Sequence, residues 1–189
     1  MHQVEIFRPT LTRLVGVLNR VGVRFHLTGG VTAVAYGEPR MTQDLDLVID
    51  SEAALRNREA LLRELAAAGF YLEEQTVRAA LAARTMFQIL DIDQALKLDL
   101  YPESSIPGEL ARSVMAEVLP GLMLPIAARS DAALSKLIWA SHGSHKSRRD
   151  CREILRHASS EELAVVKSMS VERNLLALLE QILVETDPP

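Results

Sequence analysis

The strongest constraint on how this chain folds is an alternation of acidic and apolar residues, Asp44-Leu45-Asp46-Leu47. A period of two is typical of a β-strand, so it places both carboxylates on one face and both leucines on the other. Two carboxylates on one strand face repel each other unless a cation lies between them. The pattern therefore favours a hard divalent ion such as Mg²⁺, which prefers oxygen ligands and often bridges to phosphates.

A glycine pair lies upstream of this strand. Residues 25–27 read as a short strand that stops at Gly29-Gly30, and residues 31–36 have the small, apolar character of a buried helix. Glycines allow a backbone to approach a ligand closely, and the amides of a helix N-terminus donate hydrogen bonds to anions. Thr28 could add a hydroxyl. A strand-to-helix turn with positive φ is the alternative, and it explains one glycine more easily than two.

A second alternation, over residues 95–100, predicts a strand with leucines on one face and Lys97 and Asp99 on the other. Asp99 is thus a carboxylate in the middle of a strand that otherwise looks buried. It could instead be a solvent-facing residue paired with Lys97. Asp91 and Asp93 compete for a functional role, but they are predicted to lie in the turn before this strand.

The totals restrict the class of protein. A chain of 189 residues with a net charge of −4 is one domain, or one domain with a helical extension, and is too acidic to coat nucleic acid non-specifically. The single Cys151 rules out an internal disulfide and suits a reducing cytoplasm. No run of about 18 apolar residues and no signal peptide is evident. We therefore expect a cytoplasmic protein that does not enter the membrane.

The character of the chain changes near residue 129. Residues 1–128 mix predicted strands and helices, including a helix at about 52–68, whereas residues 129–189 read as wholly helical. Four serines are predicted to begin the helices of this second part: Ser130, Ser147, Ser160 and Ser170. The expected fold is α/β (α+β), with a mixed β-sheet core in 1–128 and a C-terminal helical region in 129–189 packed on that core.

One set of residues occurs in a characteristic order: Gly29-Gly30, Arg40, Thr42 and Asp44-Leu45-Asp46-Leu47. This set resembles the signature of the nucleotidyltransferase superfamily, which has the fold of DNA polymerase beta. Within the superfamily, this spelling looks most like bacterial nucleotidyltransferases of abortive-infection and toxin–antitoxin systems. The resemblance covers most of the chain, is strongest in residues 25–50 and is thinner after residue 100. It implies a mixed sheet that carries a metal site, followed by helices.

The resemblance implies that Asp44, Asp46 and Asp99 form a catalytic, metal-binding triad for Mg²⁺ or Mn²⁺. Two-metal nucleotidyl transfer needs carboxylates on a rigid element, because the metals must flank the reacting phosphorus. Asp99 would bridge a metal or accept a proton from the attacking hydroxyl. The plainer alternative for the first two is an edge strand that turns its polar residues outward.

The same resemblance implies several contacts to the nucleotide. Thr28, Gly29 and Gly30 would lie against the triphosphate. Arg40 and Thr42 match a basic residue and a hydroxyl of the family pattern, and they would orient the aspartate strand or contact phosphate. Arg40 could equally pair with one of the aspartates.

Further binding residues are expected in the helical region. Lys136 lies in an apolar stretch, where a lysine usually snorkels to solvent, but the resemblance implies a phosphate contact. Arg149 and Asp150, with Glu153, repeat the family's basic-Asp-x-x-acidic pattern, although the family usually has Asp at the last place. A solvated helix face is an equal alternative. The basic cluster at 142–149 could receive an RNA end or a phosphoprotein, or could link two helices.

These residues predict a Mg²⁺-dependent nucleotidyltransferase that uses an NTP and releases pyrophosphate. By resemblance, the acceptor is a tRNA 3′ end or a protein side chain, in a toxin–antitoxin or phage-defence system with a cognate toxin or antitoxin as partner. The alternative is a non-catalytic nucleotide-binding or antitoxin module of the same fold. The sequence does not indicate the preferred base or the oligomeric state.

Overall fold

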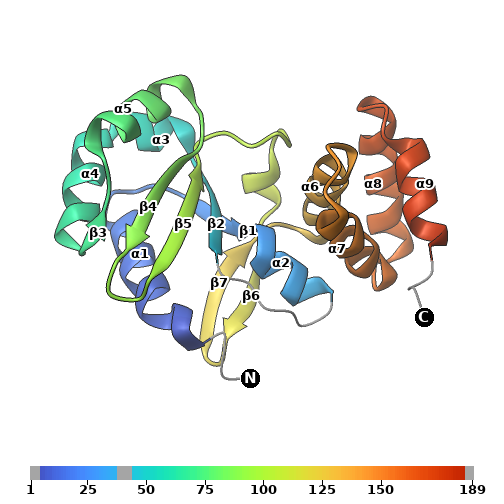
Figure 1. The fold of residues 1–189 in the computed structure, drawn as a ribbon, viewed down its shortest axis with the longest axis horizontal. Coiled ribbons are helices and arrows are strands. Elements are labelled where there is room, and N and C mark those ends of the chain that lie inside the picture. The colour runs from blue at the N-terminus through green and yellow to red at the C-terminus, as the bar shows by residue number, and fades with distance from the viewer. Residues whose placement is uncertain (1–4, 38–43, 186–189) are drawn as a thin grey trace.

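The computed structural model describes residues 5–37 and 44–185. Within these residues the core is a seven-stranded mixed sheet with the strand order β3-β4-β5-β2-β1-β7-β6. Figure 1 shows helices packed around the sheet and a group of helices at the C-terminal end of the chain. The expected mixed α/β fold with a helical C-terminal region is confirmed.

Helices and strands are interspersed up to β7, and only helices follow. The strands are β1 (Phe25–Thr28), β2 (Asp44–Ile49), β3 (Phe70–Tyr71), β4 (Phe87–Asp91), β5 (Leu96–Tyr101), β6 (Val114–Leu119) and β7 (Leu122–Ile126). The helices are η1 (Glu5–Phe7), α1 (Arg8–Arg20), α2 (Gly29–Tyr36), α3 (Ser51–Arg56), α4 (Arg58–Ala67), α5 (Glu74–Ala83), η2 (Glu109–Arg112), α6 (Arg129–Ser141), α7 (His145–Arg156), α8 (Ser160–Glu172) and α9 (Leu176–Val184). None of the helices in the described part of the chain is long and apolar enough to cross a bilayer.

One face of the sheet is closed by the main hydrophobic core. Leu45 and Leu47 of β2 and Leu98 and Leu100 of β5 are fully buried, together with apolar residues of α1, α4 and α5. Burial of each leucine contributes about 2 kcal/mol. Because side chains alternate along a strand, the polar residues of β2 and β5 point to the opposite face. That face is the one that remains for a functional site.

A second core holds the C-terminal helices together, and Arg129 links them to α2. The Arg129 guanidinium carbon lies 4.6 Å from the centroid of the Tyr36 ring in α2. Its Nη1 donates hydrogen bonds to the carbonyl of Tyr36 at 3.1 Å and to that of Ile154 in α7 at 3.0 Å. One side chain therefore ties α2, beside the glycine pair, to the helical region.

Three predicted helix boundaries are wrong. Ser147 does not begin a helix: α7 begins at His145, and its N-cap is Ser144, whose hydroxyl accepts a hydrogen bond from the backbone N–H of Ser147 at 3.2 Å. The helix expected at 52–68 is interrupted at Asn57, whose side-chain nitrogen donates to the carbonyl of Val21 at 2.8 Å, so α3 and α4 are separate. Ser170 does not begin a helix. It is buried within α8, and its hydroxyl donates to the carbonyl of Val166 at 2.6 Å. A serine satisfied in this way within a helix has the same sequence signal as a capping serine.

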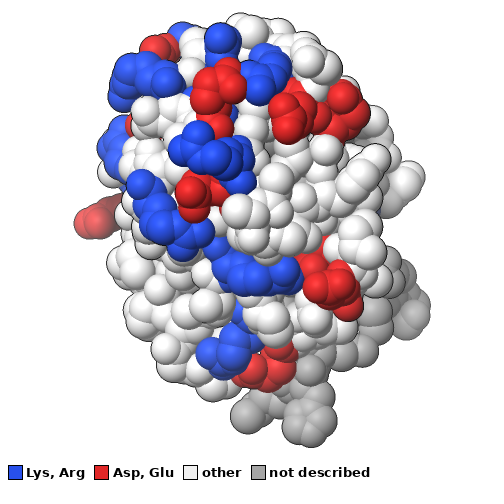
Figure 2. Space-filling view, turned by 90° about the vertical axis from the view of Figure 1, so that its left-hand side faces the viewer, with Lys and Arg blue, Asp and Glu red and all other residues white. Residues whose placement is uncertain are grey.

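The face of the molecule on which α4 and α5 lie carries charges of both signs. Figure 2 shows lysine and arginine interspersed with aspartate and glutamate on this face. Arg78 pairs with Glu59, and Arg84 pairs with Glu52. Such pairing neutralises much of the positive charge, so this face is a poor surface for phosphate backbones.

Candidate active site

The strand register brings the three predicted carboxylates to one place. Asp46 of β2 pairs with Thr28 of antiparallel β1 on one side and with Asp99 of parallel β5 on the other. Asp44 pairs with Lys97 in the same ladder. Because residues paired across neighbouring strands share a face, these side chains gather on the face opposite the main core.

A cleft of about 610 Å³ opens over this part of the sheet. One wall comes from the segment after β5 and from η2, and the other comes from α6 and the first turn of α7. Six of the predicted site residues line the cleft: Thr28, Gly29, Gly30, Asp44, Asp46 and Lys136. Asp99 lies beside Asp46 and is only 7% exposed.

Gly29 and Gly30 contribute to the site in different ways. Gly29 has a φ of +62°, and a Cβ placed there would lie 1.9 Å from Oδ2 of Asp46. The backbone N–H of Gly30 donates a hydrogen bond to the Asp46 carboxylate. The glycine pair thus allows the N-terminus of α2 to approach Asp46 and to orient it.

The electrostatics of the cleft floor are dominated by crowded carboxylates. Burial, and then the neighbouring charge of Asp99, raise the pKa of Asp46 above its ordinary value, against the opposing effects of Lys136 and the Gly30 amide. Burial, with Asp46 and Asp99, also raises the pKa of Tyr101, so this hydroxyl stays protonated and can donate to Asp46. A bound cation would relieve this repulsion.

Lys97 is the ammonium closest to two of the carboxylates in the described residues. Its Nζ lies 3.3 Å from Oδ2 of Asp99 and 3.7 Å from Oδ2 of Asp44. Burial opposes the charge on Lys97, but the contacts with Asp99 and Asp44 outweigh burial and raise the pKa of this lysine. The other oxygen of Asp99, Oδ1, is buried without a hydrogen-bond partner. Asp99 is therefore paired with Lys97 but does not face solvent.

The donor set fits a hard divalent ion in its chemistry, because carboxylate oxygens are its preferred ligands and Asp99 Oδ1 has a free lone pair. Its present geometry is not that of a finished metal site. Across residues 5–37 and 44–185, no three acidic, histidine or cysteine side chains are already grouped for a metal. The Nζ of Lys97 lies beside Asp44 and Asp99, so a cation bound at these carboxylates would compete with this ammonium.

Lys136 reaches the cleft from α6 and is held by Asp150 of α7. Its Nζ lies 3.1 Å from Oδ2 of Asp150, and the two residues are 9% and 7% exposed. Neither residue is on a solvated helix face. Glu153 is also buried and pairs with Arg156. Arg149, in contrast, is exposed and is not among the described residues that line the cleft.

Other residues singled out in the sequence lie away from this floor. Arg40 and Thr42 fall outside the described residues, so their proposed contacts stay predictions. Asp91, the competing acid, is not in the turn but at the end of β4, where it is buried and bonded to Thr10 and Arg13 of α1. Its role in the fold is structural.

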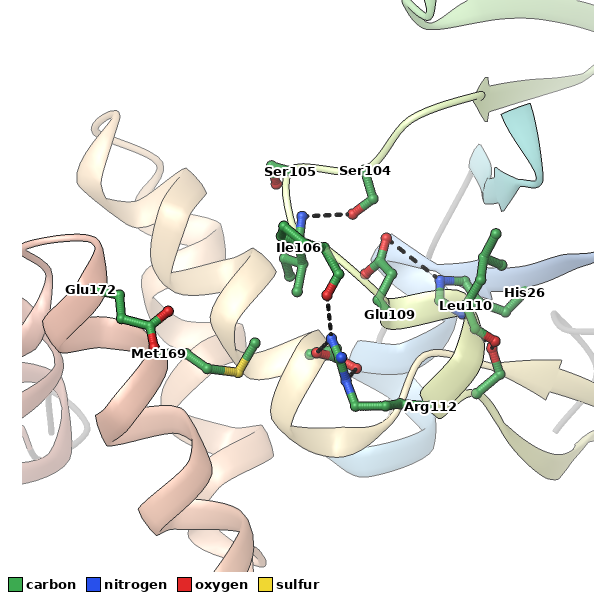
Figure 3. A network of polar contacts seen from close by, with 12 residues as sticks. His26, Ser104, Ser105, Ile106, Glu109, Leu110, Arg112, Met169 and Glu172 are labelled. Atoms are coloured by element: carbon green, nitrogen blue, oxygen red, sulfur yellow. Dashed lines mark hydrogen bonds and ion pairs between the residues drawn. The ribbon is translucent and has the colours of Figure 1, made fainter. Parts of the chain in front are cut away.

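The cleft contains a buried acid that the sequence analysis missed. Glu109 of η2 is 4% exposed, and its Oε1 lies 3.8 Å from Nε2 of His26 in β1 without a hydrogen-bond partner. Figure 3 shows Glu109 pointing toward His26. His26 Nδ1 is 2.8 Å from the hydroxyl of Ser113. No periodicity marks the segment that contains Glu109, and only the folded chain brings η2 against β1.

Comparison with protein families decides the assignment. The model of the nucleotidyl transferase AbiEii toxin, of type IV toxin–antitoxin systems, matches residues 14–174. The chain belongs to this family. The matched residues include the carboxylates of β2 and β5 and the Lys136–Asp150 pair. The AbiEii-type chain is therefore a nucleotidyltransferase associated with toxin–antitoxin systems, as its resemblance to that superfamily implied.

A solved structure shows the same fold. The antibiotic-resistance factor ANT(2'')-Ia superposes on the AbiEii-type chain with a TM-score of 0.60 and 16% sequence identity, covering 95% of each chain. At this identity the similarity supports the architecture and says nothing of the substrate. Comparison with curated proteins gives no match.

Proposed function

We propose that this chain is a Mg²⁺-dependent nucleotidyltransferase that moves a nucleoside monophosphate from an NTP to a hydroxyl of RNA, such as a tRNA 3′ end, or of a protein. One observation carries the proposal. Asp99, buried and with one unpartnered oxygen, lies in register with Asp46 on the cleft floor beside the N-terminus of α2. Buried carboxylates of this kind, gathered in a cleft, are typical of functional sites.

Several groups of the chain are placed to receive the triphosphate. The N-terminus of α2 lies at the floor, where the positive end of the helix dipole favours an anion. Lys136 adds a positive charge at the same floor. Asp44, Asp46 and Asp99 would hold Mg²⁺ or Mn²⁺ in competition with the Lys97 ammonium. Such ions, when bound, neutralise the charge of the carboxylates and of the phosphates.

The transfer needs one proton acceptor from the chain. We assign this role to Asp99 Oδ1, which has no hydrogen-bond partner of its own. The acceptor hydroxyl gives its proton to Asp99 while its oxygen forms a bond to the α-phosphorus. The bond from that phosphorus to the oxygen bridging to the β-phosphate breaks, and pyrophosphate leaves with the electron pair. Most of the catalysis is positioning and charge stabilisation.

The proposal extends to the organisation and biology of the chain. We propose that residues 1–128 form the catalytic core and residues 129–189 form a helical region that closes the cleft. The toxin–antitoxin family fits a cognate antitoxin as a partner of the chain. We further propose that the protein acts in the cytoplasm, where NTP and tRNA are available.

Measurements of NTP binding and of nucleotide transfer test this function by comparing a site variant with a control variant. Calorimetric titration with each NTP and Mg²⁺ should give binding that is lost in Asp44→Asn/Asp46→Asn and retained in Asp93→Asn, a change at an exposed turn. The labelled nucleotide is then followed into tRNA and into protein of a cell extract. Unchanged NTP binding and labelling in the double variant would show that the chemistry takes place elsewhere.

A further inference from the structure

An exposed aromatic residue in the cleft has no role in the triad or the phosphate contacts. Trp139 of α6 lines the cleft, yet it is 53% exposed. Tryptophan carries a large apolar surface that proteins usually bury in the core or in an interface. An indole left open within a ligand-sized cleft indicates a site for a planar ligand.

Trp139 lies close along α6 to Lys136, the lysine at the proposed phosphate-binding floor of the cleft. Lys136 and Trp139 are three residues apart in α6, so they are neighbours on the helix surface and about 4.5 Å apart along its axis, and His142 is the C-cap residue that follows α6. All three line the cleft. Lys136 is the buried member, and its charge acts on Asp46 at the floor. Trp139 therefore lies about one helical turn from the lysine at the floor.

The indole packs against the imidazole ring of His142. The His142 and Trp139 rings meet edge to face, with centroids 6.1 Å apart and an interplanar angle of 86°. This geometry is a favourable arrangement for aromatic pairs. A preorganised ring loses little conformational freedom when a second aromatic ring stacks on it.

We propose that Trp139 is the stacking platform for the nucleobase of the bound nucleoside triphosphate. This inference rests on the proposed function for the presence of an NTP. When the triphosphate is held at the floor by the α2 N-terminus and Lys136, the nucleobase is the aromatic part of the ligand and reaches the neighbouring turn of α6. Stacking tolerates every base, so this platform supplies affinity and leaves the choice of base to other groups.

The chain provides its own probe, because Trp139 is the only tryptophan in the sequence. Intrinsic tryptophan fluorescence of the full chain therefore reports on this residue alone. Titration with ATP, CTP, GTP and UTP in the presence of Mg²⁺ should quench or shift the emission. Inorganic tripolyphosphate with Mg²⁺ should bind in calorimetry and leave the emission unchanged, because it has no base. NTP binding without any change in emission would overturn the proposal.

Variants separate stacking from phosphate binding. Trp139→Ala should weaken NTP binding by about 10-fold or more and leave tripolyphosphate binding unchanged. Trp139→Phe, which keeps an aromatic face, should retain most of the NTP affinity. Tyr71→Ala is the matched control, because Tyr71 is 60% exposed in β3 and does not line the cleft. Equal losses for NTP and tripolyphosphate in Trp139→Ala would overturn the proposal.

Three further outcomes test this inference separately from the proposed function. Quenching by NTP without transfer of label would support the platform and contradict the transferase assignment of the isolated chain. Transfer of label by Trp139→Ala with an unchanged KM for NTP would contradict the platform and leave the transferase assignment intact. Quenching by single-stranded RNA but not by NTP would assign the indole to the acceptor and would also overturn the proposal.

Discussion

Gly29 allows the helix backbone to approach the candidate metal-binding carboxylate. With φ at +62° and a Cβ position 1.9 Å from Asp46 Oδ2, Gly29→Ala must strain the backbone and displace Asp46. Gly22 has a similar φ of +69° and nothing within 4 Å of its Cβ position. Both alanine variants should lose about 1–2 kcal/mol of stability in chemical denaturation.

Only Gly29→Ala should also lose NTP binding and nucleotidyl transfer, by about 10-fold or more, because one misplaced catalytic group has a cost of that order. Calorimetry and label transfer measure the difference between the variants. Equal binding by Gly29→Ala and Gly22→Ala would contradict a functional role for the close approach of the helix to Asp46.

Lys97 competes with a metal for the same carboxylates. Because its Nζ lies near Asp99 and Asp44, Lys97→Gln should remove a competing cation and increase the affinity for Mg²⁺ by several-fold. Calorimetric titration of Mg²⁺ tests this, with Lys167→Gln as a control that removes the same charge from an exposed position on α8. Weaker Mg²⁺ binding in Lys97→Gln alone would instead indicate that Lys97 supports the loaded site.

Alternation in the sequence was sufficient to predict which face carries Asp44, Asp46 and Asp99, because strand geometry translates directly into side-chain direction. The place of Glu109 was not predictable in this way. Its burial depends on a contact with His26, far away along the chain. The exposure of Trp139 depends similarly on the cleft and not on the periodicity of α6.

The contact between α1 and the end of β4 depends on a buried acid. Burial alone would raise the pKa of Asp91, but hydrogen bonds from Thr10 and Arg13 outweigh it and hold this pKa below its ordinary value. A lowered pKa in the folded state stabilises the protein above the unfolded pKa of about 3.9. That contribution is lost as the pH falls through the folded value.

Asp91→Asn should therefore lower the free energy of unfolding by about 2 kcal/mol at neutral pH, because it removes the charged acceptor of hydrogen bonds from Thr10 and from the partly exposed Arg13. The difference from the wild type should shrink as the pH falls below about 4. Urea denaturation over this pH range gives the measurement, with the exposed Asp93→Asn as control. A difference that is constant with pH would show that the charge of Asp91 contributes nothing.

The apolar periodicity of the sequence predicted where helices occur better than it predicted where each helix begins and ends. The stripe at 52–68 continues across Asn57, but the contact of Asn57 with Val21 breaks the helix. This contact involves a residue from another part of the chain, and local pattern does not contain it. The division at residues 1–128 and 129–189 remains a prediction about folding units.

Tyr36 packs against both hydrophobic cores, and the cleft is lined by residues of the sheet and of α6 and α7, so ligand binding and the stability of the helical region should be coupled. Cys151 lies in the second core, fully buried, and its thiol contacts the carbonyl of Ala133 at 3.4 Å. Burial raises the pKa of the Cys151 thiol to about 12. Since the thiolate is the reactive form, thiol reagents should label the folded protein only when the helices open.

This labelling rate measures how firmly the helical region is held. Arg129→Met removes the contacts to Tyr36 and Ile154, so Cys151 should be labelled several-fold faster than in the wild type. The exposed Arg63→Met on α4 should have no effect. Mg²⁺ with NTP contacts both walls of the cleft in our proposal and should therefore slow labelling of the wild type. If Arg129→Met labels no faster, the two cores are held together by other contacts, and closure of the cleft does not depend on this arginine.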